Sequence, residues 1–250
     1  MEPPPLHSTA YGWMMLAGIL VSILFWSRLA RRDERLVLIY IAALVSAFVG
    51  AKLVYLAAEG WLYWHHPDRW VILATGKSVI GALLGGYLGV EIAKCLLHYD
   101  GVTGDWFAII VPVGIMLGRI GCMVHGCCLG RECDAAWFAL NDPQGVPRWP
   151  ASQVEFAFNA IMLGALLVLR RKRIAPGQLF HIYLVAYGLF RFFHEFLRDT
   201  PHVLGLFSGY QVAALAAAIL GAIGFIRRRA GQRNIPDVDV KTAGEKWSGR

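Results

Sequence analysis

The chain has 250 residues, of which 57% are hydrophobic and only 16% are charged. A soluble domain rarely has this composition, and the apolar residues come in blocks of roughly 17–25 residues, the length that spans a bilayer. The formal net charge is +7, but no basic patch is interleaved with exposed aromatic residues, which argues against nucleic acid as a partner. We therefore expect an all-α integral membrane protein with a single transmembrane helical domain over residues 1–229.

Seven apolar blocks are expected to form the transmembrane helices. In chain order they cover residues 11–26, 36–57, 79–97, 106–124, 154–169, 178–197 and 210–226. The third block carries glycines at helical spacing, which lets neighbouring helices approach closely. Near its end, Glu91 and Lys94 are expected to pair with each other. Residues 59–77 form an aromatic connector, and we expect the polar tail 230–250 to be disordered.

Arginine-rich segments follow the first, fifth and seventh blocks. On a path that crosses the membrane at every block, these three segments lie on the same side. The positive-inside rule then predicts a cytoplasmic C-terminus and an N-terminus outside. The ends of the fourth and sixth blocks and the start of the third face outward in this topology.

Two arginines in these outward ends are the first functional candidates, because hydrocarbon penalises a charged side chain by about 2.5–3.5 kcal/mol. Arg119 lies near the end of the fourth block. The sixth block carries a polar stripe at steps of three and four residues, formed by Tyr187, Arg191, Glu195 and Arg198. One interpretation is an Arg191–Glu195 ion pair that only locks helix packing. The other is that Arg119 and Arg191 hold an anion between them, and a phospholipid headgroup phosphate suits that place.

A cysteine cluster follows Arg119 and contains Cys122, Cys127, Cys128 and Cys133, with His125 among them. The residue types suit zinc or an iron–sulfur centre, but the spacing is not the usual pair of Cys-x2-Cys knuckles. A disulfide and free thiols are the alternatives. We expect no metal and no cofactor. His125 is either an interfacial residue with its hydrogen bonds satisfied or a base.

These segments together resemble the prolipoprotein diacylglyceryl transferase family over most of the chain. Gly118-Arg119-Ile120-Gly121, running on to Gly130-Arg131, is similar to the family signature Gly-Arg-Ile-Gly-Asn with its second Gly-Arg. The stripe from Tyr187 to Arg198 resembles the family's last signature. Tyr11-Gly12, the segment 77–82, and Pro150 with Glu155 resemble three further motifs.

The resemblance implies an enzyme that moves the diacylglyceryl group of phosphatidylglycerol to the cysteine thiol of a prolipoprotein signal peptide and releases glycerol phosphate. It implies a multi-pass protein of the bacterial inner membrane, in contact with membrane lipid, whose active site faces the outer side. Arg119, Arg191 and Tyr187 are the implied catalytic residues. The substrate-binding positions are Tyr11, Ser78, Gly81, Gly121, Cys122, Gly130, Glu195 and Arg198.

Four positions depart from the family pattern. Ile80 stands where the family's Ser-x-His-Gly segment has histidine, and Cys122 stands in place of asparagine. Trp149 and Val154 replace the histidine and the tyrosine of His-Pro-Ser-Gln-x-Tyr-Glu. The acceptor thiol has an ordinary pKa near ~8.5, so a base or a cationic environment must produce the thiolate. We place His125 in that role, with His194 or the arginines alone as alternatives.

Three hypotheses follow from the sequence. The first is a divergent transferase that acts on prolipoproteins. The second is a paralogue that keeps the lipid-phosphate site but uses another acceptor or cysteine-based chemistry. The third is a non-catalytic lipid-binding membrane protein.

Overall fold

The computed structural model describes residues 9–31, 33–202, 205 and 207–233. Eight α-helices lie in these ranges: α1 Thr9–Ala30, α2 Arg35–Ala58, α3 Arg69–Thr75, α4 Val79–Leu96, α5 Gly104–His125, α6 Ala151–Arg171, α7 Leu179–His194 and α8 Gly209–Arg233. Two 3-10 turns, η1 Gly60–Tyr63 and η2 Glu195–Leu197, and a small hairpin of β1 Leu140–Asn141 and β2 Pro147–Arg148 complete the described elements. The fold is all-α, as predicted.

All seven predicted apolar blocks are helical, and α3 with η1 adds a short helical element inside the predicted aromatic connector. Five helices are long and apolar enough to cross a membrane, namely α2, α4, α5, α6 and α8, and α1 contains a shorter apolar stretch. The α8 helix continues to residue 233. The first residues of the predicted tail are therefore helical, and residues 234–250 lie outside the described part.

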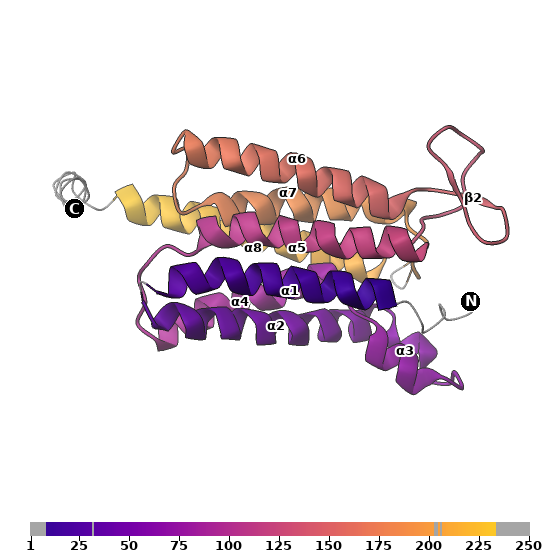
Figure 1. Cartoon of the computed structure of the whole chain (residues 1–250), viewed down its shortest axis with the longest axis horizontal. Coiled ribbons are helices and arrows are strands. Elements are labelled where there is room, and N and C mark those ends of the chain that lie inside the picture. The colour runs from indigo at the N-terminus through magenta and orange to yellow at the C-terminus, as the bar shows by residue number, and fades with distance from the viewer. Residues whose placement is uncertain (1–8, 32, 203–204, 206, 234–250) are drawn as a thin grey trace.

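The long helices run along one axis of the molecule (Figure 1). The α2 helix packs on α4, α7 packs on α8, and α5 lies between α1 and α6. The α2–α4 contact is close because glycines face it. A Cβ added at Gly85 would lie 2.2 Å from the Ser46 carbonyl oxygen, and one added at Gly50 would lie 2.4 Å from the Gly81 carbonyl oxygen. The small residues that the sequence analysis singled out therefore do bring helices together.

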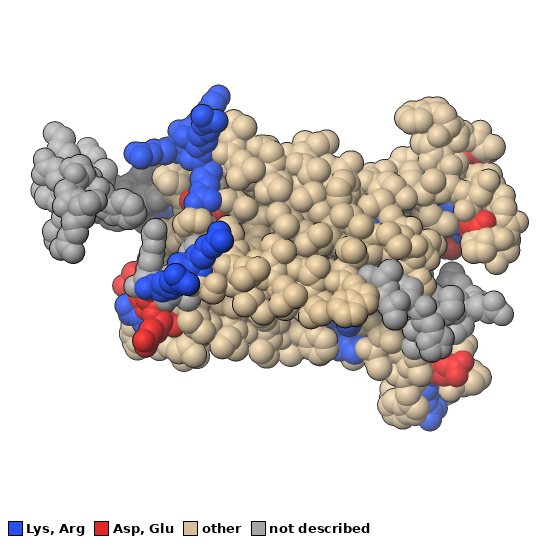
Figure 2. All heavy atoms as spheres, viewed as in Figure 1, with Lys and Arg blue, Asp and Glu red and all other residues tan. Residues whose placement is uncertain are grey.

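Basic side chains gather at one end of the bundle, and the middle of the face in Figure 2 is almost free of charge. At this basic end the Arg170 guanidinium lies 4.0 Å from the ring centroid of Trp106. Arg228 pairs with Glu91 at 2.7 Å. The predicted Glu91–Lys94 pair is therefore wrong: Glu91 takes a partner from α8 across the helix interface instead of one on its own helix.

The opposite end carries α3, the β-hairpin and the irregular segment from Gly126 to Pro150 (Figure 1). This segment is hydrogen-bonded within itself and to η2, which follows α7. Gly130 N donates to the Trp149 carbonyl at 2.8 Å, and Arg131 N donates to the Leu197 carbonyl at 3.0 Å. A Cβ at Gly130 would lie 2.4 Å from that Leu197 oxygen, so the close approach requires glycine. The segment thereby covers the end of the bundle where the polar helix ends meet.

Candidate active site

A carboxylate at the start of α6 is the centre of a buried ion cluster. Glu155 is fully buried. Arg119 Nη2 donates to both of its carboxylate oxygens at 2.7 Å, and the Tyr187 hydroxyl donates to Oε1 at 2.8 Å. These partners come from α5 and α7, so one carboxylate joins three helices. Carboxylates are buried in this way only when they are paired and hydrogen-bonded.

Two further arginines surround the same carboxylate. Arg191 Nη1 lies 3.6 Å from Glu155 Oε2, and Arg198 Nη1 lies 4.0 Å from it. Arg191 Nη2 also lies 2.8 Å from Glu195 Oε2, so the ion pair of one of the two interpretations of this stripe is present. The cluster thus includes Arg119 and Arg191 together, but the anion between them is Glu155. The sequence predicted a lipid phosphate between these two arginines.

The cluster has more donors than its carboxylates satisfy. Nε and Nη1 of both Arg191 and Arg198 are buried without a hydrogen-bond partner among the described residues. Three arginines face two glutamates in the ion pairs, which leaves one net positive charge. Burial, together with the positive charges of Arg191 and Arg119, lowers the pKa of Arg198. Such a site favours an additional anion, because unpaired buried donors and charges are costly.

The backbone of Glu155 is held by a second layer of polar groups. Asn159 Nδ2 donates to the Glu155 carbonyl at 2.8 Å, and Tyr183 donates to Asn159 Oδ1 at 2.7 Å. Asn159 and Tyr183 are both buried. These bonds run between α6 and α7, so they fix the register in which Glu155 meets the arginines.

The two histidines considered as bases occupy different environments. His194 is buried, and its Nε2 accepts a hydrogen bond from the Trp149 indole at 3.2 Å. Trp149 precedes α6 and therefore contacts a histidine at the end of α7. His125 is the last residue of α5 and is half-buried. Within the described ranges it makes no hydrogen bond to the ion cluster.

The remaining predicted substrate-binding residues lie mostly in the scaffold. Ser78 caps α4 by accepting from Gly81 N at 3.2 Å, and a Cβ at Gly81 would lie 2.4 Å from the Gly50 carbonyl oxygen. Gly121 is buried within α5. Tyr11 lies on α1, but its side chain is outside the described part of the structure.

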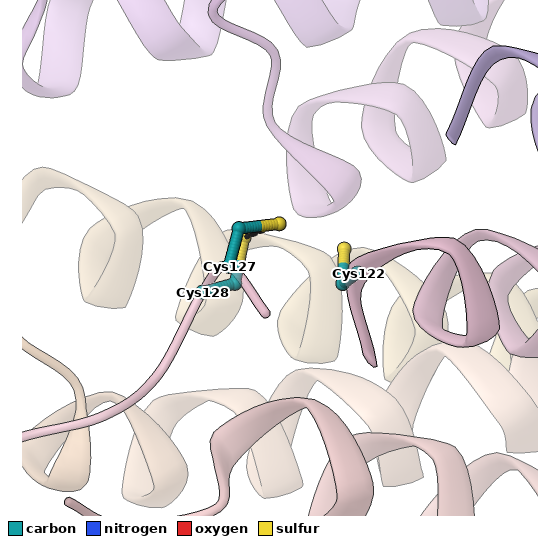
Figure 3. Close-up of side chains that lie close together, drawn as sticks. All are labelled: Cys122, Cys127 and Cys128. Carbon is teal, nitrogen blue, oxygen red and sulfur yellow. Dashed lines mark hydrogen bonds between the residues drawn. The ribbon is translucent and has the colours of Figure 1, made fainter. Parts of the chain in front are cut away.

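Three of the clustered cysteines do come together in space. The sulfurs of Cys122, Cys127 and Cys128 all lie within 4.8 Å of one another. Cys122 lies at the end of α5, and the other two lie on the segment that follows (Figure 3). Arg119 Nη1 donates to Cys122 Sγ at 3.9 Å, so this thiol trio adjoins the ion cluster. Cys133 and Cys95 are not part of it.

Apolar helices of membrane-spanning length around a buried arginine–glutamate cluster define a multi-pass membrane protein with an anion-attracting site near one end of the bundle. The sequence profile of one family, the prolipoprotein diacylglyceryl transferases, matches residues 1–227. The chain belongs to the prolipoprotein diacylglyceryl transferase family.

Individual relatives agree with this assignment. The chain is 30% identical over 229 residues to phosphatidylglycerol–prolipoprotein diacylglyceryl transferase 2 of Clostridium perfringens (strain 13 / Type A), covering 86% of this chain and 88% of the relative. It is 28% identical over 250 residues to the transferase of Mannheimia succiniciproducens, covering 92% and 93%. It is 30% identical over 245 residues to that of Cupriavidus metallidurans, covering 88% of each.

Sequence reasoning missed the central role of Glu155, although two signals pointed to it. It is the acidic residue in the second turn of α6, a helix long and apolar enough to cross a membrane, and such a position requires a partner in a membrane protein. It also lies at the end of a segment that resembles a family motif, from Pro150 to Glu155. Its partners come from positions 36, 32 and 36 residues away, which no local pattern shows.

Proposed function

We propose that this chain transfers the diacylglyceryl group of phosphatidylglycerol to the cysteine thiol of a prolipoprotein. The family assignment and the activities in the relatives' names support this reaction. The observation that carries it is the set of buried guanidinium nitrogens on Arg191 and Arg198 that have no hydrogen-bond partner among the described residues, in a cluster whose ion pairs leave a net positive charge. A guanidinium fork binds phosphate oxygens in pairs, so these donors suit the headgroup phosphate.

The proposed reaction exchanges one bond for another. The acceptor sulfur forms a C–S bond to the terminal carbon of the diacylglyceryl group while the C–O bond to phosphate breaks. The bonding electrons leave with the phosphate oxygen as glycerol phosphate, and the thiol proton passes to a base or to water. Negative charge therefore builds on the phosphate. Fixed cations in a dry site stabilise that charge, an effect worth several kcal/mol in enzymes generally.

Within this proposal the cluster residues take different roles. Arg191 and Arg198 contact the phosphate through Nε and Nη1, which make no hydrogen bond to the described residues. Arg119 adds positive charge, but its Nη2 is engaged by Glu155. Tyr187 and Glu195 hold Glu155 and Arg191 in place. Both glutamates are then positioning residues, because they act through the arginines.

The proposed orientation follows from charge. The last turn of α6 carries Arg170 and Arg171, the last turn of α1 carries Arg28, and basic side chains gather at this end of the bundle in Figure 2. The ion cluster lies toward the opposite end. The positive-inside rule assigns the basic end to the cytoplasm. The site then opens to the outer side of the inner membrane, with the N-terminus outside and the C-terminus inside.

The proposed base lies outside the ion cluster. Ile80 is buried where the family motif has histidine. His194 Nε2 is occupied by the Trp149 indole, whereas His125 is half-buried and makes no such bond. We therefore keep His125 as the proposed base. His125→Gln should slow transfer and flatten its pH profile, and an unchanged profile removes His125 from the mechanism.

The test of the function is transfer of labelled phosphatidylglycerol to a lipobox peptide by the purified chain in bilayers. Product with a thioether-linked diacylglyceryl group is expected from the wild type, and rescue of a transferase-depleted bacterial cell is expected in vivo. An inserted, folded chain that binds the lipid but gives no product would support a lipid-binding protein instead. Transfer to another acceptor without rescue would support the paralogue.

A further inference from the structure

The thiol trio, formed by Cys122, Cys127 and Cys128, is not used by the proposed transfer. Its sulfurs lie within 4.8 Å of one another, and the sulfurs of Cys127 and Cys128 are 3.6 Å apart. Zinc–sulfur bonds of ≈2.3 Å in tetrahedral geometry set neighbouring sulfurs about 3.8 Å apart. The trio therefore needs only small side-chain rotations to take one ion.

The backbone brings the three sulfurs together in a way that the sequence spacing hides. The α5 helix ends at His125, and Gly126 takes a left-handed conformation with φ of 68°. Cys127 N then donates to the Cys122 carbonyl at 3.1 Å, which turns the chain back over the helix end. Cys128 also has a positive φ of 61°. A non-glycine residue in that region is strained, and such strain often marks functional sites.

A fixed positive charge lies beside the trio, and the thiolate is the form that binds metal. Arg119 Nη1 donates to Cys122 Sγ at 3.9 Å. Three thiolates with a divalent cation carry one net negative charge, and the adjoining ion cluster has one net positive charge.

A disulfide fits the adjacent pair less well. Disulfides usually join Cα atoms 4.4–6.8 Å apart, whereas consecutive Cα atoms are separated by about 3.8 Å. A bond between Cys127 and Cys128 would therefore strain the backbone. Cys127 and Cys128 can instead bind the same ion, which requires no bond between their sulfurs.

We infer that Cys122, Cys127 and Cys128 form a binding site for a thiophilic divalent cation, with Zn²⁺ as the representative ion. Three protein ligands leave a fourth coordination position. Cys128 is exposed, so this position is accessible from outside the helix bundle. If the proposed function holds, that position has a use, because a thiol bound to zinc loses its proton. Binding itself does not depend on the transferase activity.

The experiment uses the full chain, purified under reducing and oxygen-free conditions and exchanged into metal-free buffer. We expect one Zn²⁺ per chain by elemental analysis, and thiolate-to-metal charge-transfer bands when Co²⁺ or Cd²⁺ is added instead. Cys128→Ser should weaken binding at least roughly tenfold, because even outer-shell changes cost 10–100-fold. Cys127→Ser and Cys122→Ser should do the same. Cys95→Ser and Cys133→Ser are matched controls and should bind as the wild type does.

Each result decides the inference. Reduced wild-type chain that binds no Zn²⁺, or Cys128→Ser that binds as tightly as wild type, overturns it. A disulfide among the three cysteines that persists in oxygen-free preparations also overturns it. The transfer assay, run with and without Zn²⁺, is read separately. Zinc binding without transfer in either form leaves the site established and counts against the proposed function.

Discussion

Arg119 Nη2 lies 2.7 Å from both carboxylate oxygens of Glu155, and both side chains are buried. The pair joins the end of α5 to the start of α6 at the end of the bundle opposite the basic residues. Neither charge is tolerated alone in a low-dielectric interior. Glu155 is therefore both the counter-ion that lets three arginines share one site and the group that orients them.

Glu155→Gln should destabilise the protein strongly. The change leaves Arg119 buried without its carboxylate, and breaking a buried pair costs about 3–5 kcal/mol. Unfolding of the chain in detergent micelles, followed by tryptophan fluorescence, measures this loss. The control is Asp33→Asn. It removes the carboxylate that pairs with the exposed Arg35 at 3.1 Å, and it should leave unfolding unchanged. Equal effects of the two variants would mean that the buried pair contributes no more to stability than the exposed pair does.

Arg198→Gln should abolish most lipid-phosphate binding while leaving the fold intact. Arg198 lies 3.7 Å from Glu195 and 4.0 Å from Glu155, so its loss removes charge without removing the short Arg119–Glu155 bonds. By analogy with loss of one transition-state donor, transfer should fall about 10²–10³-fold. Arg171→Gln, at the opposite end of the bundle, is the control. Wild-type transfer by a folded Arg198→Gln chain contradicts its assignment to the phosphate.

Tyr187→Phe tests whether orientation of Glu155 matters for turnover. The variant removes the hydroxyl that donates to Glu155 Oε1 at 2.8 Å. A hydrogen bond to a charged group is worth about 1.5–3 kcal/mol, which corresponds to tenfold or more in rate. We expect the loss in kcat rather than in KM. Tyr183→Phe removes the bond to Asn159 instead, and should lower stability while the folded enzyme keeps its kcat.

Cys128 should react with iodoacetamide at a lower pH than Cys127. Hydrogen bonds from Cys122 and Cys127 lower the pKa of Cys128, and the same coupling raises the pKa of Cys127. Because the thiolate is the reactive form, a lowered pKa moves the midpoint of alkylation below the ordinary value of about 8.5. Peptide mapping by mass spectrometry after timed alkylation of metal-free chain separates the two residues. Cys122→Ala should shift the Cys128 midpoint upward, and equal midpoints in the wild type would show that the coupling is absent.

Gly85→Ala should disrupt the α2–α4 contact. The new Cβ would lie 2.2 Å from the Ser46 carbonyl oxygen, so the two helices must separate. Overpacking of this kind costs about 1–3 kcal/mol, and here the obstacle is backbone and cannot rotate away. The yield of folded protein and its thermal unfolding measure the effect. Gly114→Ala meets nothing within 4 Å and is the control. A Gly85→Ala chain with the wild-type yield and thermal unfolding would show that α2 and α4 can move apart without loss of stability.

Local patterns predicted much of the fold. Apolar blocks of spanning length predicted seven of the eight described α-helices, five of which are long and apolar enough to cross a membrane. The prediction works because a helix satisfies its own backbone hydrogen bonds without reference to the rest of the chain. The α3 helix was missed because its seven residues lie in a mixed aromatic connector with no clear period. The Glu91–Lys94 prediction failed for a related reason. A neighbour at helical spacing competes with partners from other helices, and Arg228 of α8 is closer.

The sequence by itself determined that the chain is a bundle of apolar helices with a basic end, and that Arg119 and the stripe on α7 are its unusual features. These conclusions depend only on hydropathy, charge and helical spacing. Only the tertiary structure decided what stands between the arginines. Glu155 meets Arg119, Tyr187 and Arg191 across three helices, and electrostatic pairing in a dry interior depends on distances that helix packing alone sets. The same packing, together with the left-handed Gly126, brings three sulfurs within 4.8 Å of one another. Their spacing in the sequence had argued against a metal site.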